Sequence, residues 1–169
     1  LRITTYAKHI STLAEFASNP KSGGGELSVK RKFTKSDLII KIGVLSKIKG
    51  VSEKTAELLV ENNITVADLV GGCKIVDFKY YSGKSIGSAR SKKILNSVRA
   101  KSTQINILSG IPSISKASAR FILSTTSMIV LINLSRSYPD DNSLQNLKKT
   151  EKAKIGKNGA KNIAKFLIT

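Results

Sequence analysis

The chain is poor in the residues that form disulfides, metal sites and stacking surfaces. It has one cysteine, Cys73, one histidine, His9, and no tryptophan. A single cysteine excludes an intramolecular disulfide and fits a reducing, intracellular compartment. The few tyrosines and phenylalanines hardly interleave with the basic residues, which disfavours a platform for stacking single-stranded bases.

Acidic residues are also scarce, and they are scattered. The closest pair, Asp140 and Asp141, follows Pro139, where a turn is the expected role. Metal-assisted phosphodiester cleavage requires clustered carboxylates to hold Mg²⁺. The sequence also lacks a Gly-rich nucleotide loop, a zinc-spaced Cys/His set and a Ser/His/Asp constellation. We therefore expect no catalytic residue, metal, cofactor or small-molecule substrate for this chain.

No long hydrophobic run is present, and no secretory signal appears. The most apolar stretch, residues 121–134, is short for a membrane span and contains Ser, Thr and Asn. We expect a buried pair of helices there and no membrane partner.

Positive charge is what the chain has in excess. Lys and Arg number 29 against 11 acids, which gives a net charge of +18 and a pI near 10.2. A compact chain with this charge has a strong positive field, and nucleic acid is its natural counterion. Most lysines individually solvate the surface, but several cluster at or just after four repeated turns.

The four turns belong to a repeated pattern of an apolar residue, a short Gly- or Ser-bearing turn and a helix. The copies are residues 45–59, 80–95, 108–123 and 151–167. The first and third copies align at a shift of 63, and the second and fourth at a shift of 69. The segment SYPDDN (137–142) absorbs the difference and is predicted to be an enlarged surface loop. Such a repeat predicts an architecture of duplicated units.

The first copy shows why the turn suits an anion. Ile48 and Val51 anchor it, and Gly50 between them is free to take a positive φ. Ser52 stands where a helix N-cap belongs. Free amides of the turn and the helix start then point outward together and form a compact phosphate site. The candidate caps of the other copies are Ser88, Ser115 and Asn158.

Each copy resembles the helix-hairpin-helix module, the non-specific DNA-binding element of repair nucleases, glycosylases, ligases and polymerases. As two pairs, the copies resemble the C-terminal region of the XPF family of structure-selective nucleases, including homologues in large DNA viruses. The resemblance covers about residues 36–169. It implies an all-α fold of two tandem double helix-hairpin-helix domains, residues 36–101 and 102–169, with Ser102 and Thr103 as caps of the helix that opens the second. Residues 1–35 are expected to form an N-terminal helical extension, helical over 6–17, with a flexible break at 19–26 and a basic linker.

The resemblance places phosphate contacts at the turns and helix starts. They are Lys49, Gly50, Val51, Ser52 and Lys54 in the first copy, Ser85, Ile86, Gly87, Ser88, Arg90 and Lys92 in the second, Lys116 in the third, and Lys154, Ile155, Gly156, Lys157, Asn158 and Lys161 in the fourth. No copy keeps both glycines of the family's G-h-G turn. The third keeps neither, since Ser113 and Ser115 stand there, so we expect that turn to serve the core and Ser113→Val to cost less DNA binding than Gly156→Val.

Three functions stay open at the level of sequence. The first is sequence-tolerant binding of duplex or branched DNA as the positioning module of an XPF-type nuclease, whose acidic E-R-K-x-x-x-D motif this chain lacks. The second is an architectural or structural protein of a virion or of chromatin. The third is RNA binding, because charge alone does not separate the two polymers. The resemblance further implies a homo- or heterodimer partner, and a location in the nucleus, or in the virion or viral factory if the chain is viral.

Overall fold

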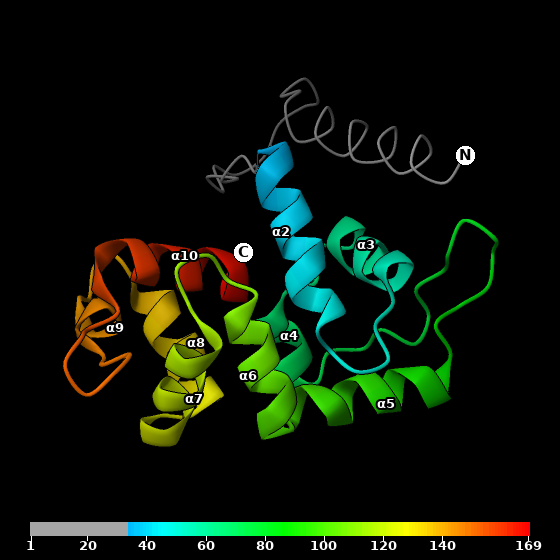
Figure 1. Cartoon of the computed structure of the whole chain (residues 1–169). Helices are drawn as coiled ribbons and strands as arrows, with labels where there is room; N and C mark the ends of the chain where they lie inside the picture. Colours follow the sequence, from blue (N-terminus) through cyan, green and yellow to red (C-terminus); the bar gives the residue numbers. More distant parts are fainter. Residues whose placement is uncertain (1–33) are drawn as a thin grey trace. The chain divides into compact units, whose positions relative to one another are not determined.

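The computed structural model describes residues 34–169, and its regular elements are helices (Figure 1). Two isolated antiparallel bridges, Lys79 with Ser85 and Lys148 with Lys154, occur in this part of the chain, which contains no strand. The expected all-α class is therefore confirmed. The predicted helix over 6–17 and the break at 19–26 lie outside the described residues.

Short turns or loops separate most of the helices. The helices are α2 (Lys35–Ser46), α3 (Glu53–Glu61), α4 (Val66–Gly71), α5 (Ser88–Arg99), α6 (Lys101–Ser109), α7 (Lys116–Thr125), α8 (Met128–Ser137), α9 (Ser143–Asn146) and α10 (Gly156–Ile168). At the start of α2, Asp37 and Thr34 exchange hydrogen bonds, because the N–H of each meets the other's side-chain oxygen at 3.1 and 3.0 Å. Asp37 thus lies in the first turn of α2, where the positive end of the helix dipole favours a carboxylate.

Residues 42–169 form one compact unit, and the described residues before them, 34–41, belong to a separate one. Within the unit of residues 42–169 α6 packs against α7, and α10 packs against α4, α8 and α9. Helix α4 also contacts α5 and α8. These contacts place residues 42–101 and 102–169 in one compact unit. A division into separate domains between residues 101 and 102 stays a prediction.

An aliphatic core fills the unit of residues 42–169, as expected for a chain rich in Ile, Leu, Val and Ala. Helix α10 shows how it forms, because Ala160, Ile163, Ala164 and Leu167 share one helical face and are all buried. The face meets α4, α8 and α9. Other large side chains that are fully buried include Leu45, Ile48, Leu59, Leu69, Ile75, Ile94, Ile107, Leu108, Ile111, Ile122, Met128 and Leu131.

One residue, Ala100, joins α5 to α6. Its backbone is extended, with φ −71° and ψ 132°, and it is at once the C-cap of α5 and the N-cap of α6. The expected caps Ser102 and Thr103 are therefore wrong, since both lie inside the first turn of α6. The side chain of Gln104 instead closes the end of α5, donating from Nε2 to the carbonyl of Val98 at 3.2 Å.

Helices α7 and α8 occupy the apolar stretch at 121–134. Most of its large side chains are buried, whereas Ile129 and Val130 at the start of α8 are exposed. In the part of the chain that the structure describes, no single helix has the length and apolar composition to cross a membrane. Helices α7 and α8, bent by 95° at the break between them, meet that test as a pair by length and composition.

Candidate nucleic-acid interface

Each of the four repeated turns contains one residue in the left-handed region. Gly50, Gly87 and Gly156 have φ values of 98°, 77° and 75°, as their glycines allow. Ser113, which aligns with Gly50, has a φ of 76°. A non-glycine residue there is uncommon. The third turn therefore makes the same backbone demand as the first, although it lacks the glycine.

This conformation bears on the expectation for the third turn. We expected Ser113→Val to cost less DNA binding than Gly156→Val because the third turn lacks both glycines, but Ser113 has the positive φ of a glycine position. Valine is β-branched and is strained at positive φ in any of the four turns. Ser113→Val is therefore no mild change for the backbone. The relative DNA binding of the two variants stays a prediction.

An apolar residue next to the left-handed one fixes each turn to the core. In chain order these anchors are Val51, Ile86, Ile114 and Ile155, and they are 6%, 5%, 4% and 4% exposed. Their amides are also occupied, because they donate to the carbonyls of Ile48, Phe78, Ile111 and Leu147 at 3.0, 2.9, 3.1 and 2.7 Å. Three of the four were expected to contact phosphate: Val51, Ile86 and Ile155. The structure uses both their side chains and their N–H groups internally, so they hold the turns in place.

Serines cap the helices that follow the first and third turns. Ser52 and Ser115 have extended backbones, and their Oγ atoms accept the N–H of Thr55 at 3.3 Å and of Ser118 at 3.0 Å. Both predicted caps are confirmed. Both residues are exposed, so the helix starts that they cap face solvent.

The second and fourth turns start their helices without a side-chain cap. Helix α5 begins directly after Gly87, and α10 begins at Gly156, so the expected caps Ser88 and Asn158 are wrong because they lie inside the first helical turn. A left-handed glycine at the boundary has no side chain to accept a hydrogen bond. Among the described residues the amides of Ser88 and Lys157 meet no acceptor. Exposed donors at a helix start favour a bound anion.

An antiparallel bridge closes the loop before each of these two turns. Tyr80 N–H donates to the carbonyl of Lys84 at 2.9 Å, and Lys149 N–H donates to that of Ala153 at 2.8 Å. The two pairs are related by the same shift of 69 that aligns the sequences. The bridges place Ser85 and Lys154, two expected phosphate contacts, beside the anchors and exposed.

Helices α5 and α10 also hold the turns of the odd copies. Ser97 Oγ on α5 donates to the carbonyl of Lys49 at 2.9 Å. Asn162 Nδ2 on α10 donates to the carbonyl of Pro112 at 3.2 Å and to Ser113 Oγ at 3.3 Å. Lys49 and Pro112 directly precede the left-handed residues. The first turn is therefore bonded to the helix of the second copy, and the third turn to the helix of the fourth copy.

Cationic side chains surround the turns and point to solvent. Lys154 is held in place, because its Nζ donates to Asn146 Oδ1 on α9 at 3.2 Å. Exposed cations at or after the turns include Lys47, Lys49, Lys54, Lys84, Arg90, Lys92, Lys93, Lys116, Arg120, Lys152, Lys154, Lys157 and Lys161. All the lysines and the arginine expected to contact phosphate are thus accessible to a nucleic acid.

A chain of hydrogen bonds joins the first turn to the start of α5. Ser52 Oγ and Thr55 Oγ1 lie 2.9 Å apart, as do Thr55 Oγ1 and Tyr80 OH. Arg90 Nη1 donates to Tyr80 OH at 3.0 Å. The sequence analysis missed Thr55 and Tyr80. A hydroxyl three residues after a cap is a local signal for Thr55, but no local signal connects it to Tyr80.

Three other titratable groups of the described part have pKa values displaced from their ordinary range. Burial and then the charge of Asp68 raise the pKa of Cys73, so its thiol stays protonated at neutral pH. Tyr81 is 80% exposed, and its hydrogen bond to Glu61, 2.6 Å long, raises the pKa of Tyr81 to about 12. Ser143 donates to Asp141 from its hydroxyl and its N–H, which lowers the pKa of that carboxyl and supports the turn expected there.

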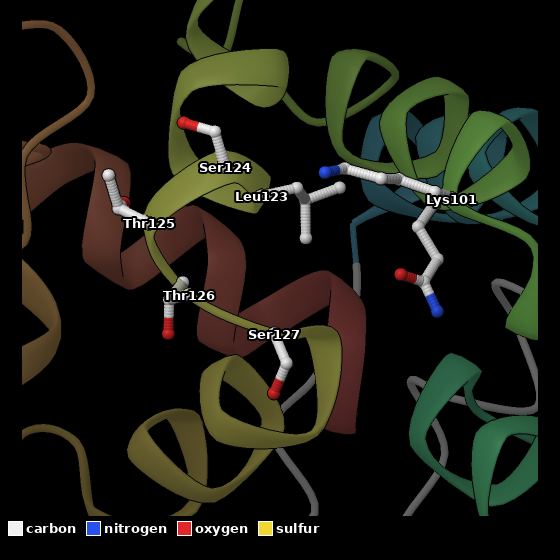
Figure 2. Close-up of a pocket in the computed structure, with 7 residues that line it drawn as sticks. Lys101, Leu123, Ser124, Thr125, Thr126 and Ser127 are labelled. Carbon is white, nitrogen blue, oxygen red and sulfur yellow. The ribbon is translucent and has the colours of Figure 1, made fainter.

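A depression of about 410 Å³ lies beside the connection between α7 and α8 (Figure 2). Lys101, Gln104 and residues 123–127 line it, and Figure 2 shows the Lys101 side chain extending toward Leu123. Several of its hydroxyls already have partners, since Ser124 donates to the Phe121 carbonyl at 2.7 Å and Ser127 caps α8. The described residues contain no group of three or more His, Cys, Asp and Glu side chains that could hold a metal ion. The four turns are thus the better candidate site.

The chain matches no protein-family model, no curated protein and no solved structure. The geometry of the turns and the charge around them are therefore the basis for a function.

Proposed function

We propose that the chain is a sequence-tolerant DNA-binding module built from two tandem double helix-hairpin-helix domains. The observation that carries the proposal is the left-handed residue in all four turns, each beside a buried anchor and a solvent-facing helix start. At the second and fourth turns the amides of Ser88 and Lys157 stay open at a helix start, and the helix dipole adds to their attraction for an anion.

The charge of the chain favours phosphate as that anion. The net charge is +18, and the cations at the turns are exposed. Lysines bind phosphate as point charges, and an arginine can bind it with two parallel hydrogen bonds. Backbone amides and lysines respond to the position of phosphates and carry no information about the bases. The module therefore tolerates any DNA sequence.

We propose further that the module positions DNA for an XPF-type nuclease and does not itself cut it. The scarcity of carboxylates in the sequence supports this division of roles, because metal-assisted cleavage needs several of them together. Duplex or branched DNA is the proposed partner. An architectural protein would show the same turns, so an acidic E-R-K-type nuclease motif elsewhere in the full-length gene separates the two roles.

Salt dependence tests the proposed DNA binding. Several phosphates should be neutralised, so we expect affinity for duplex DNA to fall by about a hundredfold or more between roughly 50 and 200 mM salt. Fluorescence anisotropy with a labelled duplex measures this, with a scrambled duplex and an RNA duplex as competitors. Equal affinity across the salt range, or strong preference for one sequence over its scramble, contradicts the proposal. Tighter binding of the RNA duplex reassigns the polymer.

A further inference from the structure

The first and second turns, which form the first pair, share a hydrogen-bond network. The third and fourth turns, which form the second pair, lack it. In the first pair the hydroxyls of Ser52, Thr55 and Tyr80 and the guanidinium of Arg90 form an unbroken hydrogen-bond chain. Thr55 is fully buried at 0% exposure, and Tyr80 is half-buried. At the shift of 69, Lys149 and Gly159 stand in place of Tyr80 and Arg90. The sequence of the second pair therefore provides no residues for the outer half of this chain.

Arg90 fixes the direction of the outermost hydrogen bond. A guanidinium only donates, so the Tyr80 oxygen accepts from it. The 2.9 Å contact between Tyr80 OH and Thr55 Oγ1 allows either oxygen to donate, and we assign the proton to Tyr80 because a phenol is a better donor than an aliphatic hydroxyl. With that assignment Thr55 donates its hydroxyl proton to Ser52 Oγ, which also accepts the Thr55 N–H at 3.3 Å. With its lone pairs occupied, the Ser52 oxygen directs its own proton outward, to solvent.

The corresponding serine of the second pair points its proton inward. Ser115 Oγ donates to Ser118 Oγ at 3.0 Å and accepts the Ser118 N–H at 3.0 Å. No tyrosine follows to reverse this direction. Ser52 and Ser115 are thus equivalent as helix caps and opposite as donors.

We propose that Tyr80 is a positioning residue that makes the first pair of turns a combined donor site for the DNA backbone. Ser52 supplies an outward hydroxyl proton from one turn, and Arg90 supplies its remaining guanidinium donors from the other. The proposal rests on the DNA binding proposed above. It assigns to the first pair of turns the donors that are held in position before DNA binds.

Three features of this row of hydrogen bonds support the role of Tyr80. Its links measure 2.9, 2.9 and 3.0 Å, so Ser52 and Arg90 are close enough to meet one stretch of a single strand's backbone. A row of hydrogen bonds that all point the same way polarises its last member, which strengthens the Ser52 donor. A guanidinium held by one N–H also loses less freedom when its other N–H groups bind a phosphate.

The test is Tyr80→Phe in the full chain, which removes one oxygen and keeps the ring. We expect duplex DNA affinity to fall about 5- to 10-fold, because Arg90 loses its restraint and Ser52 is no longer forced to donate outward. Tyr81→Phe is the matched control, since it makes the same change at the next residue, whose hydroxyl bonds Glu61 instead. We expect this control to stay within roughly twofold of the wild type.

A double-mutant cycle separates positioning from general destabilisation. Tyr80→Phe, Arg90→Ala and the double variant are compared by anisotropy well below their unfolding temperatures. If Tyr80 acts through Arg90, the combined loss of affinity is smaller than the product of the single losses. Losses that multiply would show that the two residues act independently, and would overturn the positioning role.

Arg90→Lys serves where Tyr80→Phe fails to fold, because Arg90 is exposed. Lysine keeps the charge and loses the planar fork, so we expect weaker binding with an unchanged salt slope. A wild-type chain that does not bind duplex DNA refutes the proposed function itself. A wild type that binds, with Tyr80→Phe or Arg90→Lys equal to it, leaves DNA binding standing and overturns the role of Tyr80.

Discussion

At the scale of single residues, the left-handed turn positions set the sharpest limits on substitution. Gly156 has a φ of 75°, and a Cβ added there would meet no atom within 4 Å. Any cost of a side chain at this position therefore comes from the backbone. We expect Gly156→Ala to lower the free energy of unfolding by about 1 to 2 kcal/mol, measured by urea denaturation.

Gly43 provides the control for this prediction. It lies within α2, in ordinary helical backbone, and an added Cβ also meets nothing within 4 Å. Gly43→Ala should raise the free energy of unfolding by about 0.5 to 1 kcal/mol, because alanine is the better helix former. Equal losses in both variants would show that positive φ is not the cause.

At Ser113 we expect the opposite effect on stability, because a serine already occupies a left-handed position there. Ser113→Gly should raise the free energy of unfolding by about 1 kcal/mol, reduced by the loss of the 3.3 Å hydrogen bond from Asn162. Ser115→Gly, two residues later in extended backbone, should bring no gain, because it removes a helix cap. A stability gain from Ser115→Gly and none from Ser113→Gly would contradict the assignment of strain.

At the scale of elements, the capped helices α3 and α7 allow stability and binding to be separated. Ser52→Ala and Ser115→Ala each remove one cap, so each should lower the free energy of unfolding by about 1 kcal/mol. Only Ser52 directs a proton outward, so only Ser52→Ala should also weaken DNA binding in the anisotropy assay. Equal binding losses in the two variants would mean that the caps act on DNA through the helices alone.

Local signals in the sequence predicted the two serine caps that follow the first and third turns. Ser52 and Ser115 were found because a capping hydroxyl sits next to the helix that it starts. Ser88 and Asn158 were misassigned because α5 begins directly after left-handed Gly87 and α10 begins at left-handed Gly156, so both residues lie inside the first helical turn. A glycine that starts a helix leaves no side-chain signature, so sequence alone places such a boundary poorly.

Long-range contacts were the part of the site that the sequence did not reveal. The bond between Thr55 and Tyr80 spans 25 residues, and its geometry depends on how the loop before α5 folds back. The left-handed φ of Ser113 was also hidden, because the aligned glycine is missing and the packing of Asn162 against the turn is needed to recognise it. The positive charge, the helical class and the two serine caps are properties of neighbouring residues and were predictable.

At the scale of the whole molecule, residues 42–169 should unfold as one cooperative unit. Helix α10 packs against α4 and α8, and α5 contacts α6, so neither half is complete without the other. Differential scanning calorimetry should give one transition whose calorimetric and van't Hoff enthalpies agree. Two resolved transitions would instead show that residues 42–101 and 102–169 unfold independently.

The single-residue joint at Ala100 has a consequence for selectivity. A flexible linker would let two binding halves adapt to any DNA, at an effective concentration set by its length. A joint of one extended residue between two helices gives no such slack. Once the first pair of turns is bound, the local concentration of the second pair is either very high or close to zero, depending on whether the phosphates ahead follow the matching path. Both pairs would then bind together only to DNA whose backbone follows that path. A bend, a branch or a gap would be distinguished from straight duplex without any contact to a base.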